Sequence, residues 1–247
     1  MKVDVKIINI LEECTYDDKT LFLPNIQLSR PDYVAVNKVL ELLGGKWNRK
    51  VKGHIFEYSP EEAVENVILT GEITDIKKDF QFFPTPTAVV EQMLSLADIK
   101  KDSIILEPSC GKGNIADAIH RAYPNNKLLG IELNSMLNDV LKDKPYEVLA
   151  ETDFLQYNTE KWDRIVMNPP FSKMQDIDHI LHAYDLLASD GILVSVCSMS
   201  PFYRTCKKAE AFREFVDSHN ATVIKLPEGA FKESGTMVQT CIVVVRK

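Results

Sequence analysis

The first part of the chain joins an alternating segment to a helical one. The letters VDVKIINI, residues 3–10, alternate apolar and polar side chains, which predicts an opening β-strand. Ser29 followed by Asp32 has the spacing of a capping box, with a proline between them in the first helical turn. Apolar residues then recur every three or four positions, so we expect a helix that ends at Gly44.

A hairpin and a second helix complete this first part. The letters KWNRKVKGHIFEY, residues 46–58, predict a short hairpin or two separate strands. Ser59 and Pro60, with Glu62 as the capping partner, predict the start of a helix that ends at Gly71. We therefore expect a small α/β module at the start of the chain.

The rest of the chain alternates short apolar strands with amphipathic helices. This alternation is typical of a parallel sheet with helices on both faces. We expect an α/β fold with a doubly wound, mostly parallel sheet over residues 76–247, after a small module over residues 1–75. The predicted strands are 103–108, 127–133, 146–151, 164–168, 191–197, 222–227 and 240–246, and the predicted helices lie at 86–97, 115–122, near 136, at 177–187 and at 209–218.

Composition places the chain among globular proteins. Hydrophobic residues make up 45% of its 247 residues and charged residues 26%, and no apolar run is long enough to span a bilayer. Acidic residues come too early for a signal peptide, so we expect a cytoplasmic protein without a membrane partner. The five cysteines form no C-x-x-C pair and the five histidines lack a ligand set, which predicts free cysteines and no metal site.

Two segments with ligand-binding chemistry fall where predicted strands end. In LEPSCGKGN, residues 106–114, Gly111 and Gly113 precede a helix, which lets the backbone approach a ligand closely. In GIELN, Glu132 ends the next strand, where a carboxylate accepts hydrogen bonds from ribose hydroxyls. The glycine pattern matches neither the dinucleotide fingerprint nor the P-loop, so we expect a different cofactor that carries a nucleoside.

Polar residues also end the third and fourth strands. Asp153, in ETDFLQY, could accept from the amine of an adenine with Phe154 against the ring, or could be an ordinary helix cap. In IVMNPPF, residues 165–171, a strand stops at Asn168 and two prolines, which fix φ and donate no hydrogen bond. Taken alone, this is either a strand end or a rigid platform for a ligand.

The motifs FFPTP, EPSCGKG, IELN, TDF and NPPF, in this order, resemble the S-adenosylmethionine-dependent DNA adenine-N6 methyltransferases. The resemblance covers about residues 80–247, and the closing segment LPEGAFKESGTMVQTCIVVVRK is similar to the last strand pair of that family. NPPF alone also occurs in methyltransferases of RNA and of protein glutamine. The resemblance implies a seven-stranded Rossmann-like sheet, S-adenosylmethionine as the cofactor, and duplex DNA with a flipped adenine as the substrate.

The resemblance also implies roles for individual residues. Asn168 and the Pro169 carbonyl would hold the target amine, Pro170 would stiffen this platform, and Phe171 would stack on the flipped base. The cofactor would be held by the following residues: Phe82, Phe83 and Thr85 at its methionine part, Glu107, Pro108, Gly111 and Gly113 around the methionine and ribose, Glu132 on the ribose, Asp153 and Phe154 on the adenine, and Asn168 beside the methyl group.

An adenine amine needs help to react, because its lone pair is delocalised into the ring. Two acceptors that hold both amine hydrogens favour a more tetrahedral nitrogen, whose lone pair points at the methyl group. Transfer then depends mainly on positioning, with no metal and no covalent intermediate. Extruding the base costs a few kcal/mol, and stacking on Phe171 would recover roughly 1–3 kcal/mol.

A basic segment stands out against the net charge of −7. Residues 46–54 contain Trp47 and four cations, namely Lys46, Arg49, Lys50 and Lys52. We hypothesise that this segment contacts DNA; the alternative is a solvated hairpin whose Trp47 packs on the preceding helix. Arg204, in SPFYR after the fifth strand, could meet a phosphate or simply belong to a packed loop.

Competing functions stay open at this point. An RNA methyltransferase with a similar core is the first rival, and glutamine methyltransferases usually show NPPY and lack FxPTP. A catalytically silent DNA-binding relative need not keep Glu107, Gly111, Asp153 and Asn168, which are all present. Many members of the family carry a large target-recognition domain after the catalytic part, and no segment here matches it. The target sequence, the oligomeric state and any companion nuclease are therefore not predicted.

Overall fold

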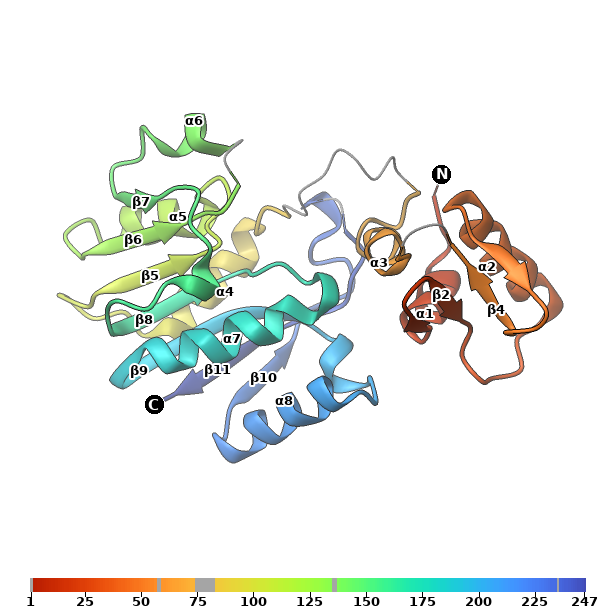
Figure 1. Ribbon diagram of the computed structural model, residues 1–247. Helices are drawn as coiled ribbons and strands as arrows, with labels where there is room; N and C mark the ends of the chain where they lie inside the picture. Colours follow the sequence, from red (N-terminus) through yellow and green to blue (C-terminus); the bar gives the residue numbers. More distant parts are fainter. Residues whose placement is uncertain (1, 57–58, 74–82, 135–136, 235) are drawn as a thin grey trace. The chain divides into compact units, whose positions relative to one another are not determined.

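The computed structural model describes residues 2–56, 59–73, 83–134, 137–234 and 236–247. The chain divides into two compact units, Met1–Gln81 with Gly235–Val238, and Phe82–Ser234 with Gln239–Lys247 (Figure 1). The expected boundary between residues 75 and 76 lies outside the described residues. Each unit has a hydrophobic core of its own.

Helices and a small antiparallel sheet form the first unit. Its core is made by apolar side chains of the helices and of the sheet. The strands β1 (Thr15–Asp17), β2 (Thr20–Phe22), β3 (Lys46–Asn48) and β4 (Gly53–Ile55) lie in the order β1-β2-β4-β3. The helices are α1 (Val5–Glu12), α2 (Arg30–Leu42) and α3 (Glu61–Thr70) within the described residues.

The prediction of an opening strand at residues 3–10 is wrong, because this segment forms most of helix α1. The Asp4 carboxylate caps the helix by accepting the Lys6 N–H at 2.8 Å. Ile7, Ile8 and Leu11 are all buried. A strand would point the neighbours Ile7 and Ile8 to opposite faces, whereas a helix buries both together.

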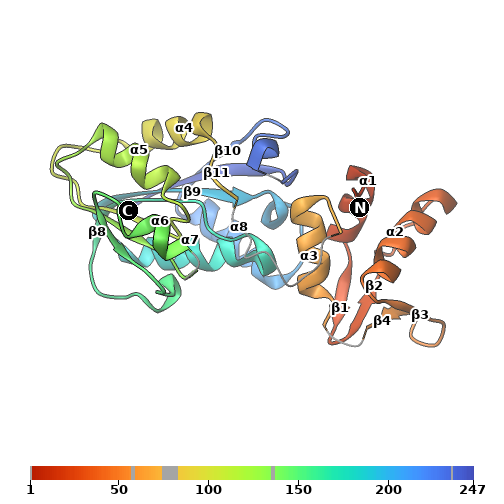
Figure 2. The same ribbon diagram turned by 90° about the horizontal axis from the view of Figure 1, so that it is seen from above.

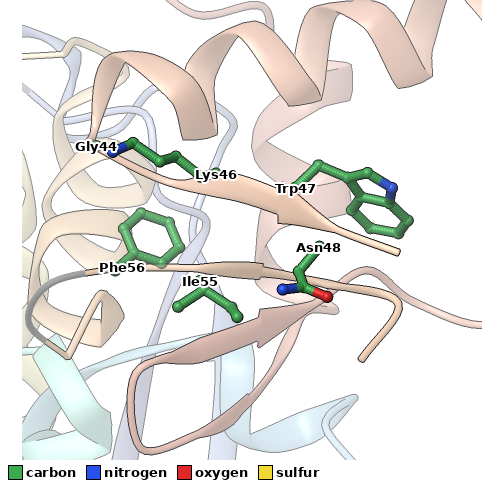
Figure 3. Close-up of a pocket in the computed structure, with 6 residues that line it drawn as sticks. All are labelled: Gly44, Lys46, Trp47, Asn48, Ile55 and Phe56. Carbon is green, nitrogen blue, oxygen red and sulfur yellow. The ribbon is translucent and has the colours of Figure 1, made fainter. Parts of the chain in front are cut away.

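Most of the other predictions for this unit are confirmed. Helix α2 begins at the predicted cap, where Ser29 Oγ accepts the Asp32 N–H at 3.3 Å. Helix α3 ends at Gly71 with φ +68°, as predicted, but no capping box starts it, since Pro60 is its N-cap and makes no side-chain hydrogen bond. The hairpin prediction is confirmed by β3 and β4, which pair antiparallel (Figure 3). The β1–β2 hairpin was not predicted.

The second unit is built on one large sheet. Its strands are parallel except for β11, which runs antiparallel to both neighbours. This confirms the predicted α/β class with a mostly parallel, seven-stranded sheet. Among the described residues the order is β10-β11-β9-β8-β5-β6-β7, with β5 (Ile105–Pro108), β6 (Leu128–Ile131), β7 (Glu147–Leu149), β8 (Trp162–Met167), β9 (Leu187–Ser198), β10 (Thr222–Lys225) and β11 (Thr240–Arg246).

Helices cover both faces of this sheet. In Figures 1 and 2, α4 and α5 lie on one face, while α7 and α8 lie on the other. The predicted helix near residue 136 appears as α6, which begins at Asn138; residue 136 itself lies outside the described residues. The helices are α4 (Thr87–Ala97), α5 (Asn114–Ala122), α6 (Asn138–Leu141), α7 (Gln175–Leu186) and α8 (Lys207–Ser218).

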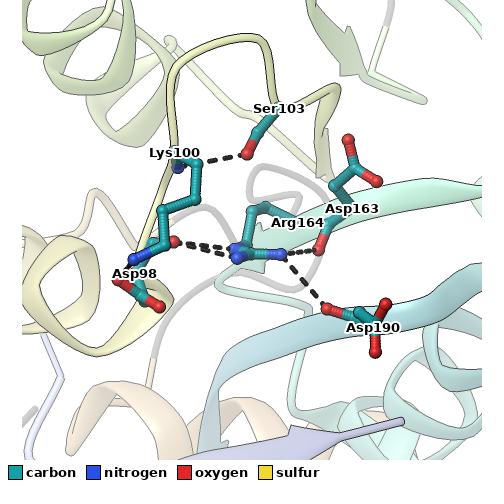
Figure 4. Close-up of polar contacts among 6 residues, drawn as sticks. All are labelled: Asp98, Lys100, Ser103, Asp163, Arg164 and Asp190. Atoms are coloured by element: carbon teal, nitrogen blue, oxygen red, sulfur yellow. Dashed lines mark hydrogen bonds and ion pairs between the residues drawn. The ribbon is translucent and has the colours of Figure 1, made fainter.

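Arg164 fixes the amino edge of the sheet. Its side chain is buried, and its guanidinium donates to the backbone carbonyls of Asp98 at 2.9 and 3.1 Å and of Asp163 at 2.7 Å (Figure 4). A longer bond of 3.4 Å reaches the Asp190 carbonyl. Because these carbonyls come from three separate segments, the network ties together the chain around the starts of β5, β8 and β9.

Three further observations concern the described residues as a whole. No helix among them is long and apolar enough to cross a bilayer. All five cysteines are free thiols; four are buried and Cys206 is exposed. No group of three or more His, Cys, Asp and Glu side chains in the described ranges could hold a metal ion.

Candidate active site

Four parallel strands end side by side at the carboxyl edge of the sheet, in the order β8-β5-β6-β7. Glu132 follows β6 directly, Asp153 lies four residues after β7, and Asn168 follows β8 directly. The neighbours β5 and β8 are separated in the sequence by two other strands, so the strand order reverses between them. Ligands of doubly wound sheets bind at such a switch point.

The loop between β5 and α5 has an unusual backbone. Ser109, Gly111 and Gly113 have φ angles of +62°, +57° and +88°, in the left-handed region that favours glycine. A Cβ on Gly113 would collide with the Tyr146 hydroxyl, which donates to Asp117 Oδ1 at 2.7 Å. Gly113 is therefore required by both its backbone conformation and its surroundings.

Glu132 connects the end of β6 to this loop. One carboxylate oxygen accepts the Gly111 N–H at 2.7 Å and the other accepts the Asn134 N–H at 2.8 Å. The residue is 9% exposed, so part of it still faces outward. Each oxygen keeps a second lone pair, so the carboxylate can accept further hydrogen bonds from a ligand.

Glu107, the next-to-last residue of β5, is 2% exposed. Burial raises the pKa of this carboxyl well above its ordinary value of 4.5. The Ala116 N–H, which donates to it at 2.6 Å, offsets part of this rise, while the nearby carboxyls of Asp117 and Glu132 add to it. The protonated form of Glu107 is therefore favoured more strongly than that of an exposed glutamate.

This pKa shift predicts a pH-dependent stability that Glu107→Gln should remove. Between pH 4.5 and the raised folded-state pKa, the unfolded chain releases a proton that the folded protein keeps, so stability is lost as pH rises. One such group changes the free energy of unfolding by at most about 1.4 kcal/mol per pH unit. Urea denaturation without cofactor, at a series of pH values, should show the wild-type protein losing stability relative to Glu107→Gln as pH rises.

The exposed Glu160, which pairs with Lys127, offers a matched control. Glu160→Gln controls for the loss of one negative charge at a surface position. If the curves of wild type and Glu107→Gln stay parallel from pH 4.5 upward, the raised pKa is refuted.

The two polar atoms of the Asn168 side chain differ in their hydrogen bonding. Nδ2 donates to the Phe83 carbonyl at 3.0 Å and to Thr85 Oγ1 at 3.1 Å. Because a carbonyl can only accept, the bond to Phe83 fixes which end of the amide is the nitrogen. Oδ1 is buried and has no hydrogen-bond partner among the described residues. A buried acceptor of this kind is rare and favours a ligand that donates to it.

The segment around Thr85 holds this arrangement in place. Thr85 is 5% exposed, and its carbonyl accepts from Asn114 Nδ2, in the first turn of α5, at 3.4 Å. The Pro84 carbonyl accepts from Ser234 Oγ at 2.6 Å. The structure thus brings the predicted residues Phe83, Thr85 and Asn168 together, whereas Phe82 lies outside the described residues.

The two aromatic rings that were predicted to contact ligands are buried within the protein. Phe154 is 2% exposed, and its ring lies 5.4 Å from the His179 ring and 4.8 Å from the His182 ring. Phe171 is 5% exposed. The Asp153 carboxylate accepts the Leu155 N–H at 2.9 Å and caps a short 3-10 helix, which is the alternative that the sequence left open. Ligand contacts of these residues stay predictions.

Other expected residues surround this edge. Pro108 and Pro169 are buried with the strand ends, and Pro170 is half-buried. Arg204 is also half-buried, and its carbonyl accepts from Arg213 at 2.9 Å.

Two residues near the site were not found from the sequence. His179 Nδ1 lies 3.3 Å from Ser109 Oγ in the glycine loop, and burial lowers its pKa to about 4, so it is neutral at pH 7. Asp176 is fully buried and accepts both the N–H and the hydroxyl of Ser198, at 2.9 and 2.8 Å. An acid in the first turn of a helix is common, so nothing in the sequence set Asp176 apart.

Known proteins share this arrangement of strands. Residues 88–221, more than half of the chain, match the methyltransferase small domain family. The chain belongs to this family. Its cofactor is S-adenosylmethionine, as predicted.

Individual relatives are methyltransferases of different kinds. The type II methyltransferase M.CvrRI of Paramecium bursaria Chlorella virus XZ-6E is 25% identical over 164 residues, which cover 58% of this chain and 42% of that protein. The tRNA (guanine(10)-N2)-dimethyltransferase of Methanocaldococcus jannaschii is 28% identical over 116 residues, or 40% of this chain and 33% of that protein. This chain therefore matches less than half the length of either relative.

A solved structure of a type I R-M system has the same fold in its matching part. The TM-score is 0.56 at 21% identity, over 67% of this chain and 42% of that chain.

Proposed function

We propose that this methyltransferase transfers the methyl group of S-adenosylmethionine to the N6 amine of adenine in DNA. The observation that carries the proposal is the Asn168 amide, whose Oδ1 is buried without a partner while Nδ2 is held by two bonds. The amide cannot turn to satisfy Oδ1 without facing Nδ2 away from the Phe83 carbonyl. A donor from a ligand, such as an exocyclic amine, is what this oxygen lacks.

The residues at the carboxyl edge fit the cofactor. Bound S-adenosylmethionine supplies an electrophilic methyl group. Glu132 would accept from the ribose hydroxyls, and the positive-φ loop with Gly111 and Gly113 would let the backbone approach the ligand closely. Thr85 would face the methionine part, because its hydroxyl already contacts Asn168.

The adenine amine would be held by two acceptors. Asn168 Oδ1 would accept a hydrogen bond from one amine hydrogen, and the Pro169 carbonyl would accept from the other. The two prolines would keep these acceptors rigid. Held in this way, the nitrogen lone pair would point out of the ring toward the methyl group. Transfer would form the N–C bond, break the S–C bond to leave S-adenosylhomocysteine, and release one amine proton to solvent. Stacking of the flipped base on Phe171 would require its buried ring to turn outward, since it is 5% exposed.

We propose DNA rather than RNA as the substrate for two reasons. M.CvrRI is a type II methyltransferase, and the segments FxPTP and NPPF occur together in this chain. The similarity to a tRNA methyltransferase makes RNA the second candidate. The two are separated by incubating the protein with tritiated S-adenosylmethionine and either unmethylated duplex DNA or unmodified tRNA. We expect label in the DNA; label in tRNA alone would overturn the assignment of the substrate, and no label in either would favour a silent relative.

A further inference from the structure

The β3–β4 hairpin carries an exposed indole ring, that of Trp47, which packs against a buried side chain. Trp47 is 43% exposed and sits opposite His54 in the register, with ring centroids 5.2 Å apart in an edge-on contact. His54 is fully buried, and its Nε2 lies 2.7 Å from Asn37 Oδ1 in helix α2. Asn37 Nδ2 in turn donates to Glu41 Oε1 at 2.7 Å, so Asn37 Oδ1 is the acceptor and His54 Nε2 the donor. Trp47 is thus held against an anchored ring.

A shallow pocket opens beside this ring. Figure 3 shows Phe56 near one end, Trp47 at the other, and Ile55 and Asn48 between them. Its volume of 270 Å³ lies just below the usual range for drug-sized ligands, so it suits a single flat group. The pocket is lined by Gly44, Lys46, Trp47, Asn48, Ile55 and Phe56.

Positive charge gathers on the same hairpin, and Lys46 also lines the pocket. The hairpin has four exposed cations, and within the described part of the chain no carboxylate lies in ion-pair distance of any of them: Lys46, Arg49, Lys50 and Lys52. Lys46 belongs to β3, and the turn that carries the other three cations is ordered by Asn48 Oδ1, which accepts the N–H groups of Lys50 at 2.9 Å and Val51 at 3.4 Å. Such a concentration of cations in a chain of net charge −7 fits an anionic partner.

We propose that the hairpin surface, residues 44–56, binds an unpaired segment of DNA, with a base on Trp47 and in the adjoining pocket and with phosphates on the four cations. Unpaired DNA matches both features at once, because its phosphates pair with the cations and every unpaired base has a face to stack on the exposed indole. The inference takes DNA as the polymer from the proposed function. The proposed binding residues belong to the first unit, Asn168 belongs to the second, and binding does not require methyl transfer.

Tryptophan fluorescence can report this binding directly. The chain has two tryptophans, and Trp162 is fully buried, so quenching by a ligand reports Trp47. We would titrate the full chain with a single-stranded oligothymidylate of about twelve nucleotides, a length typical of single-strand sites. The expected result is quenching in the wild type, and Trp47→Ala should lose affinity by about 5- to 150-fold, as measured by anisotropy of a labelled strand.

The charge contribution is tested with a paired variant. Arg49→Ala with Lys50→Ala should weaken binding and make the dependence of log K on log salt shallower by about 1.4, from two lost phosphate contacts. The control is Lys100→Ala with Lys101→Ala, two exposed lysines after helix α4, which should change neither. An unchanged affinity and salt slope in the Arg49/Lys50 variant would overturn the proposal.

Two other outcomes are also decisive. Tighter binding of an oligouridylate of the same length would overturn the choice of DNA in favour of RNA. Binding is also measured in Asn168→Ala protein, where we expect quenching and affinity to be unchanged. Quenching without any methyl transfer to DNA in the wild type would support the hairpin site while refuting the proposed function.

Discussion

Replacing Asn168 with alanine is expected to reduce methyl transfer to DNA by a factor of at least about 10² to 10³, while binding of S-adenosylmethionine persists. This factor is typical for removing one preorganised hydrogen-bonding group from an active site. The side-chain oxygen is the buried acceptor that would hold one hydrogen of the target amine. Single-turnover transfer of a tritiated methyl group, with calorimetric titration of the cofactor, separates the two effects.

Asn126 provides a matched control for this change. Its Nδ2 also makes two hydrogen bonds, to the carbonyls of Lys100 and Ser103 at 2.8 and 2.9 Å, but it precedes β6 and lies away from the carboxyl edge. Asn126→Ala should therefore retain transfer at the wild-type rate in protein that remains folded. Full activity in Asn168→Ala would rule out the paired-acceptor mechanism.

Replacing Glu132 with alanine is expected to weaken binding of S-adenosylmethionine by about 10²- to 10⁴-fold. Hydrogen bonds to a charged group contribute about 1.5–3 kcal/mol each, and two ribose hydroxyls would lose theirs. The change also frees the Gly111 and Asn134 N–H groups, so the glycine loop loses its anchor. The dissociation constant of S-adenosylhomocysteine, measured by calorimetry, checks this directly.

The control for Glu132 is again Glu160, an exposed carboxylate paired with Lys127 across the surface. Glu160→Ala should bind the cofactor as the wild type does. Glu132→Gln, which keeps one acceptor oxygen, should fall between wild type and Glu132→Ala. Wild-type affinity in Glu132→Ala would show that the ribose is bound elsewhere.

The large sheet was predictable from the sequence because its strands are apolar, short and separated by amphipathic helices. Segments such as ILEP at β5 and TCIVVVR at β11 have no competing interpretation as surface helices. The first unit was harder. Helix α1 has apolar residues at both odd and even positions, and an alternating reading of its first residues predicted a strand. Strands β1 and β2 are as short as β3 and β4, but no glycine marks their turn or their ends as it does for the second hairpin.

For the candidate site, the sequence predicted positions at strand ends but not the contacts between them. Sequence motifs identified Thr85, Glu132 and Asn168, each at a strand end or a helix start. The bond from Asn168 to the Phe83 carbonyl joins residues 85 positions apart, and a single sequence contains no signal for it. The same holds for Asp176 and Ser198, which only the packing of α7 against the end of β9 brings together.

The central claim is that the methyl group goes to the N6 atom of adenine, and one measurement tests it most directly. Unmethylated DNA is incubated with the protein and isotopically labelled S-adenosylmethionine, digested to nucleosides, and analysed by mass spectrometry. The predicted result is label in N6-methyldeoxyadenosine alone. Label in N4-methyldeoxycytidine or in 5-methyldeoxycytidine, or DNA without label in the presence of folded, cofactor-binding protein, would contradict the account.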